Sequence, residues 1–282
     1  MPSCWQPASP GAHAPDLEIR TRRVVLRVQR FAVVATLTCC AGIGWTSPAR
    51  ATPRAEFLRA LAVLEPIPNE QLLTTLSAFI RTRLDAIAED SSSPAVAAAA
   101  RREFLIGLAS LFDTGELLVS QRLTRAAFDG VATVDEKDRR RHLTDRFSVH
   151  GRGDSMQHFF VSCGLTAVAG PLVAERLGRL KEMADARCKD AFPERASQGF
   201  SFVDLAYDIA GIHFALMVLE PQESAIERSR MESFVDAIPD LGLPENLGWN
   251  QFQREFGGAH WNRFDDLLVK IRRATAGCAE HP

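Results

Sequence analysis

Two aspartates stand four residues apart in a segment that is otherwise almost wholly apolar. The segment is 199–211, GFSFVDLAYDIAG, and the aspartates are Asp204 and Asp208. Residues four apart lie one turn apart on the same face of a helix, and this helix is apolar around most of its circumference, so we expect it to be buried. Buried carboxylates are unfavourable unless they are protonated, paired or bound to a cation. The segment therefore predicts a polar site inside the protein.

Two upstream segments can supply partners for these aspartates. Asp154 and His158 are four residues apart, as are Lys181 and Asp185, so each pair lies on one face of its own predicted helix. Glu182 follows Lys181 directly. We predict one polar cluster drawn from three consecutive helices, and its members are Asp154, His158, Lys181, Glu182, Asp185, Asp204 and Asp208.

A divalent metal is the first chemistry that such residues can support. His158, Asp204 and Asp208 would be the ligands, a mixed set that suits zinc, manganese or iron, and an open coordination position would activate water for hydrolysis. Against this interpretation, the chain lacks the H-E-x-x-H spacing of many metalloproteases. Lys181 would also compete with a metal for the same carboxylates. A divalent metal is thus a candidate cofactor, and the cofactor is otherwise unknown.

Two interpretations need no metal. One carboxylic acid and one carboxylate could cleave a cell-wall glycan, a mechanism that depends on the distance between the two carboxyl groups. Alternatively, Lys181 and His158 neutralise the carboxylates and fix the packing of three helices. We favour this structural cluster, and whether the protein is an enzyme stays open at this point.

The order of these motifs resembles the YfiM-like family of bacterial envelope proteins, a domain of unknown function. The family pattern is D-K-x-x-H-F, a helix rich in small residues, K-E-x-x-D, and then G-x-S-x-x-D-x-x-x-D-x-x-G. The resemblance covers about residues 154–215, with Ser155 in place of the family's lysine, and a looser one extends to VanZ-like membrane proteins. It implies an envelope location and a helical fold, but no reaction. The matching residues are Asp154, His158, Phe159, Ser162, Lys181, Glu182, Asp185, Gly199, Ser201, Asp204, Asp208 and Gly211.

The first 51 residues resemble a cleavable signal peptide. Five arginines between positions 20 and 30 precede an apolar run over 31–45, and Ala49-Arg50-Ala51 has the A-x-A form of a cleavage site. The apolar run is about 15 residues, shorter than the roughly 20 that span a bilayer. We therefore expect a periplasmic or secreted mature chain that begins near Thr52.

Two other features of this leader bear on how the chain is processed. The long basic preface raises the alternative that translation starts at Val24 or Val25. A lipid anchor on Cys39 or Cys40 is disfavoured, because no small residue precedes these cysteines as a lipoprotein site requires.

Composition limits the partners and the covalent links. The formal net charge is −2, and removal of the basic leader would make the mature chain more acidic, so we expect no nucleic-acid binding. The partner is otherwise unknown. Cys163, Cys188 and Cys278 remain after cleavage, and their spacing does not select a disulfide pair. Apolar runs over 159–174 and 205–219 are too short to span a bilayer comfortably, but peripheral contact with the envelope is compatible with them.

Apolar residues recur at helical spacing along nearly the whole mature chain. We predict an all-α multi-helix bundle of about eight to ten helices. The expected organisation is a helical region over 52–132, a polar connector over 133–153, a YfiM-like core over 154–220 and C-terminal helices over 221–282. Thr52, Asn69 and Ser201 are expected to cap helices, and one further helix is expected over 114–128.

The favoured function follows from the leader, the cluster and the resemblance together. We expect an exported envelope protein with a structural or binding role that involves no catalysis. The alternative is a metal-dependent hydrolase that acts on a cell-envelope substrate.

Overall fold

The computed structural model describes residues 52–192, 199–220, 231–236, 238–257 and 260–280. In these residues there are 12 α-helices, nine of them with seven or more residues, and no strand, which confirms the predicted all-α bundle. The α-helices are α2 (Pro53–Leu64), α3 (Leu72–Asp90), α4 (Pro94–Phe112), α5 (Leu117–Ser120), α6 (Arg125–Phe128), α7 (Val134–Thr144), α8 (Ser155–Ala169), α9 (Pro171–Ala191), α10 (Phe202–Leu219), α12 (Met231–Asp236), α13 (Trp249–Phe256) and α14 (Trp261–Glu280). Two 3₁₀ helices cover Asn69–Gln71 and Pro239–Leu241.

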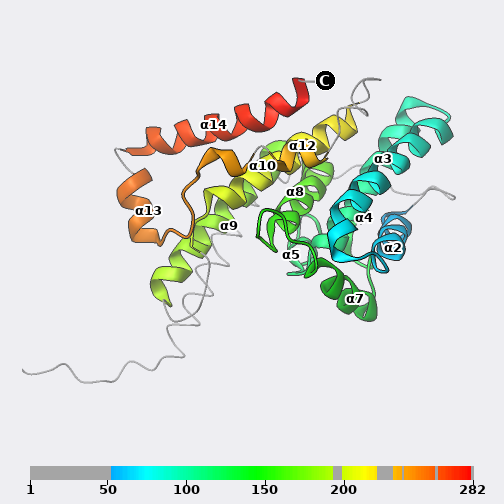
Figure 1. Ribbon diagram of the computed structural model, residues 1–282, viewed down its shortest axis with the longest axis horizontal. Coiled ribbons are helices and arrows are strands. Elements are labelled where there is room, and N and C mark those ends of the chain that lie inside the picture. Colours follow the sequence, from blue (N-terminus) through cyan, green and yellow to red (C-terminus); the bar gives the residue numbers. More distant parts are fainter. Residues whose placement is uncertain (1–51, 193–198, 221–230, 237, 258–259, 281–282) are drawn as a thin grey trace, which may run out of the picture. The chain divides into compact units, whose positions relative to one another are not determined.

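Helices α8 and α10 form the centre of the bundle (Figure 1). Helix α8 packs against α10 on one side and α4 on another, while α9 and α14 also pack against α10. The rings of Phe112 on α4 and Phe160 on α8 stack with their centroids 4.5 Å apart. The helices before and after residue 133 therefore share one core, and residues 48–282 form a single compact unit.

Helix α10 carries both aspartates of the opening segment and is deeply buried. Ser201 begins the helix as predicted, because its hydroxyl accepts a hydrogen bond of 3.0 Å from the backbone N–H of Asp204. Among the described helices, α10 alone has the length and hydropathy of a membrane span, with a mean hydropathy of 1.7, and 72% of it is buried inside the protein. Such burial is typical of the core helix of a globular bundle.

Two local predictions in the N-terminal half are wrong. In place of one helix over 114–128 the chain forms α5 and α6. The Asp113 carboxylate accepts hydrogen bonds from the backbone N–H groups of Leu117 and Leu118, so the first helical turn starts only at Leu117. Asn69 begins a 3₁₀ turn instead of capping α3, and its side-chain oxygen accepts a hydrogen bond of 2.8 Å from Arg146. A local side-chain contact decided the first position, and a tertiary contact decided the second.

The polar segment 133–153 contains helix α7, which starts at a capping box formed by Thr133 and Glu136. After α7 the chain turns back on itself through an isolated bridge between Val149 and Arg152. His150 and Gly151 adopt positive φ angles of 53° and 78° in this turn. The turn delivers Arg152 and Asp154 to the start of α8.

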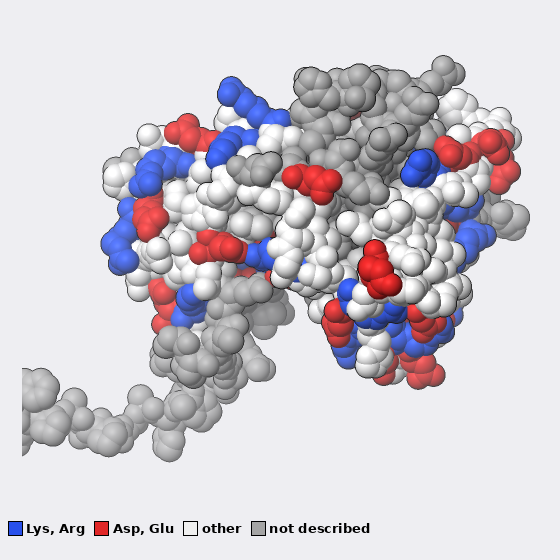
Figure 2. Space-filling view, viewed as in Figure 1, with Lys and Arg blue, Asp and Glu red and all other residues white. Residues whose placement is uncertain are grey.

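The C-terminal helices pack through aromatic rings against the start of α10. The ring of Phe200 stacks on that of Phe252 of α13, with the two ring centroids 4.4 Å apart. The ring centroids of Phe202 and of Phe264 on α14 are 5.5 Å apart. At the start of the C-terminal region expected to be helical, residues 231–236 form α12, whereas residues 221–230 lie outside the described residues. Residues 1–51, with the expected leader, also lie outside them. On the face drawn in Figure 2, acidic and basic side chains are interspersed.

Candidate functional site

All seven residues of the predicted cluster meet in the structure. Helix α8 supplies His158, with Asp154 directly before it, while α9 supplies Lys181, Glu182 and Asp185, and α10 supplies Asp204 and Asp208. Contacts within this set join the three helices. We call these seven residues, together with Arg152 and Ser162, the polar network.

His158 lies at the centre of the polar network between the two aspartates of α10. Its Nδ1 is 3.2 Å from Asp208 Oδ1, and its Nε2 is 3.3 Å from Asp204 Oδ2. The side chain of His158 is only 10% exposed. Burial disfavours the charged ring, but the carboxylates of Asp208 and Asp204 outweigh this effect and raise the pKa of His158 to about 9. The two aspartates therefore favour the protonated form of the His158 ring.

Asp208 is held on three sides. Its Oδ1 accepts a hydrogen bond of 2.8 Å from the Ser162 hydroxyl in addition to the contact with His158. Its Oδ2 lies against Gly178 of α9, where a Cβ atom would come within 2.5 Å of that oxygen. The absence of a side chain at Gly178 is thus what lets α9 approach the carboxylate.

Lys181 is the second cation of the polar network, and three carboxylates surround it. Its Nζ donates to Glu182 Oε1 at 2.8 Å, lies 3.1 Å from Asp185 Oδ2, and is 3.7 Å from Asp204 Oδ2. Partial burial works against the Lys181 charge, but these carboxylates raise its pKa. The same Nζ lies 3.2 Å from His158 Nε2, so the lysine and the imidazole ring are in direct contact.

Glu182 connects the polar network to the start of α10. Its side chain is fully buried, and its Oε2 accepts a hydrogen bond of 3.0 Å from the backbone N–H of Ser201. Burial raises the pKa of Glu182 to about 7, against the opposing effect of Lys181. Burial likewise raises the pKa of the partly exposed Asp185.

Arg152 is the main member of the network that the sequence did not predict. It forms an ion pair with the buried Asp204, a second with Asp154 at 3.3 Å, and a third with the half-exposed Glu245. Arg152 could have been predicted as a partner of Asp154, because it stands only two residues before Asp154 in the same turn. Glu245 could not be found in this way, because 93 residues separate it from Arg152.

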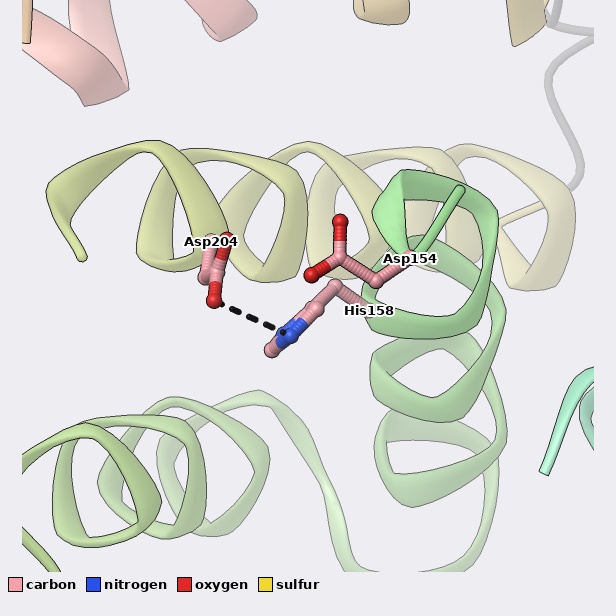
Figure 3. Close-up of side chains that lie close together, drawn as sticks. All are labelled: Asp154, His158 and Asp204. Carbon is pink, nitrogen blue, oxygen red and sulfur yellow. Dashed lines mark ion pairs between the residues drawn. The ribbon is translucent and has the colours of Figure 1, made fainter. Parts of the chain in front are cut away.

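Asp154, His158 and Asp204 are near enough to share a cation. One potential ligand atom from each lies within 4.8 Å of the others. Figure 3 shows Asp154, directly before α8, and His158 of α8 directed toward the same space as Asp204 of α10. This group differs from the predicted ligands in one member, since Asp154 takes the place of Asp208. Asp208 faces Nδ1 of the ring, whereas Asp204 faces Nε2.

Two carboxylate oxygens in the network have no hydrogen-bond partner among the described residues. They are Asp204 Oδ2 and Asp208 Oδ2, on side chains that are 1% and 5% exposed. Buried polar atoms are nearly always hydrogen-bonded, so such oxygens need an explanation. Asp208 Oδ2 packs against the backbone of Gly178, which occupies the position that a hydrogen-bond donor would need. For Asp204 the nearest polar atoms are the nitrogens of His158 and Lys181.

Cys163 lies next to the network and has no role in it. Its buried thiol donates to the Gly211 carbonyl oxygen at 3.1 Å, and burial raises the thiol pKa well above its ordinary value. A thiolate nucleophile at this position is therefore disfavoured.

Comparison with known proteins gave no relative: the chain matched no family model, no curated protein and no solved structure.

Proposed function

We propose that this protein is an exported α-helical envelope protein with a structural or binding role that involves no catalysis. The observation that carries the proposal is the position of His158 between two buried aspartates on α10, with Lys181 beside it. These contacts neutralise carboxylates that would otherwise be isolated in the core. The polar network then acts as a specific connection between α8, α9 and α10.

The ion pairs of the two buried aspartates support this role. Arg152, Lys181 and His158 each make an ion pair with Asp204, and His158 makes a second one with Asp208. Removing one partner of a buried pair leaves an uncompensated charge, which costs about 3–5 kcal/mol. The polar network thus selects one packing of the three helices over others.

The test of the structural role is a comparison of two double variants in buffer that contains a metal chelator. Asp204→Asn with Asp208→Asn removes both charges from the network, whereas Asp265→Asn with Asp266→Asn changes two exposed residues of α14. We expect the network variant to lose at least about 3 kcal/mol of unfolding free energy or to fail to fold. The α14 variant should unfold like the wild type. Equal stability of the two double variants would contradict the structural role of the polar network. The single variant Asp208→Asn, measured in the same way, shows how much of the loss comes from Asp208.

The proposal that the chain is exported rests on the leader-like sequence of residues 1–51 and on the start of α2. Thr52 caps α2 by accepting a hydrogen bond of 3.3 Å from the Ala55 backbone N–H. Cleavage after Ala51 would leave this cap intact. N-terminal sequencing of the protein from an extracytoplasmic fraction should give a start near Thr52, and a retained leader would contradict the proposal.

Membership of the YfiM-like family is part of the same proposal. Its support is that the separate blocks of the family pattern supply one network, in which Asp154, His158, Lys181 and Asp204 all take part. Ser155 stands where the family has a lysine. Arg152 provides a cation next to Asp154 instead.

A metal-dependent hydrolase is the second candidate, and one observation favours it. Asp204 Oδ2 is buried without a hydrogen-bond partner among the described residues, within reach of His158 and Asp154. A hydrolase should cleave chromogenic ester or phosphate substrates only when metal is added. The activity should disappear in His158→Gln, and a chelator-resistant activity would contradict this candidate.

A further inference from the structure

We propose that a divalent cation binds at the point enclosed by Asp154, His158 Nε2 and Asp204 Oδ2, in exchange for the ammonium group of Lys181. A set of one imidazole and two carboxylates suits manganese, zinc or ferrous iron. This inference goes beyond the structural role, because it makes the polar network a site with two alternative occupants.

The geometry needs only a small adjustment to hold the ion. Nitrogen and oxygen ligands lie about 2.0–2.2 Å from zinc, so two ligands of one ion are about 3–4 Å apart. The candidate ligand atoms of the three residues already lie within 4.8 Å of one another. Asp154 is 25% exposed and lies at the start of α8, so it can move toward the ion and also leave a route from solvent.

One oxygen of the buried Asp204 carboxylate is the second sign of a ligand. The two oxygens of this carboxylate have different roles, since Oδ1 receives the Arg152 guanidinium and Oδ2 accepts no hydrogen bond from the described residues. The ion-pair contacts of Oδ2 are longer, at 3.3 Å to His158 Nε2 and 3.7 Å to Lys181 Nζ. Arg152 can keep Oδ1 while an ion takes Oδ2, and this contact would orient the carboxylate for binding.

Lys181 stands where the ion would bind. Its Nζ lies 3.2 Å from His158 Nε2 and 3.7 Å from Asp204 Oδ2, which are two of the proposed ligand atoms. The ammonium group and a divalent ion therefore compete for the same position. The coordinating nitrogen of His158 must be unprotonated in the metal-bound form.

Lys181 has other partners to hold it after the exchange. Its contacts with Glu182 at 2.8 Å and Asp185 at 3.1 Å involve none of the three ligands. The side chain is 34% exposed, so its ammonium can turn away from Asp204 toward Asp185 and solvent. Lys181 thus competes with the divalent cation for the site, and this competition lowers the affinity of the protein for the cation.

The experiment measures binding of manganese, zinc and cobalt to the purified protein by calorimetry after chelator treatment and its removal. Lys181→Met removes the competing cation, and Lys189→Met on the same helix is the matched control, since Lys189 contacts only Asn246 among its described hydrogen-bond partners. Asp154→Asn removes a ligand at the edge of the site, where folding should survive.

We expect about one equivalent of metal in the wild type, with affinity at least tenfold higher in Lys181→Met and at least tenfold lower in Asp154→Asn. Lys189→Met should bind like the wild type, and His158→Gln should change the visible spectrum of bound cobalt. Absence of binding in both the wild type and Lys181→Met would overturn the proposal, and so would binding that Asp154→Asn leaves unchanged. The structural role is tested in chelator, so either proposal can fail without the other.

Discussion

Gly178 illustrates how one residue without a side chain shapes the polar network. Asp208 Oδ2 occupies the space in which a Cβ of residue 178 would lie, at 2.5 Å from it. A carboxylate in such a position is fixed by packing as well as by its contacts with His158 and Ser162. Its geometry therefore depends on the distance between α9 and α10.

We expect Gly178→Ala to destabilise the protein by about 1–3 kcal/mol, because the added methyl group overpacks a buried site. This loss should appear even though alanine favours a helix by about 1 kcal/mol over glycine. The measurement is urea unfolding of Gly178→Ala, Asp208→Ala and the double variant. If the clash is with Asp208, the cost of Gly178→Ala shrinks or reverses in the Asp208→Ala background. An equal cost in both backgrounds would place the clash elsewhere.

At the scale of the element, helix α10 depends on its first turn. Ser201 serves the helix twice, because its hydroxyl accepts from the Asp204 N–H and its own N–H donates to Glu182. The first contact fixes the turn that carries Asp204, and the second ties this turn to α9. The position of Asp204 in the polar network thus follows from the cap.

We expect Ser201→Ala to cost about 1 kcal/mol, whereas Ser201→Gly should cost only a few tenths, as is general for N-cap positions. Both variants keep the backbone N–H that donates a hydrogen bond to Glu182. The difference in unfolding free energy between them therefore reports on the residue preference of the N-cap position alone. Chemical denaturation of the two variants measures it. Equal losses would mean that Ser201 acts by packing, in line with its 2% exposure, and not as a cap.

At the scale of the whole molecule, the described helices share one core. Phe112 at the end of α4 stacks on Phe160 of α8, so the polar segment 133–153 does not separate two cores. Helix α7 within that segment also contributes to this core through the buried Leu143. A continuous core of this kind favours a cooperative transition.

We expect a single unfolding transition for the mature chain. Trp249 and Trp261 are the tryptophans beyond residue 51, so intrinsic fluorescence reports on α13 and α14, while far-UV circular dichroism reports on all helices. Coincident midpoints from the two probes would indicate one cooperative unit. Fluorescence that changes well before or after the helical signal would instead mean that the C-terminal helices unfold separately.

Spacing alone was enough to predict much of the candidate site. Pairs four residues apart must share a helix face, and an apolar helix must carry its aspartates inward, so His158, Asp204 and Asp208 could each be placed on an inner helix face. Arg152 and Glu245 were missed because they lie on turns and loops. There, in contrast to a helix, the spacing of residues in the sequence does not predict the direction in which a side chain points. Gly178 was missed because its role is a close approach between helices.

Helical spacing and capping residues were sufficient to predict the all-α class, the start of α10 at Ser201 and the set of acidic and basic side chains that had to be neutralised together. These properties are local, since helical spacing and capping act within a few residues. Tertiary packing set which oxygen of Asp204 receives Arg152, that Asp154 joins His158 and Asp204 in the group that could share a cation, and that Lys181 stands beside Nε2 of His158. These are distances between helices, and packing of the whole core sets them.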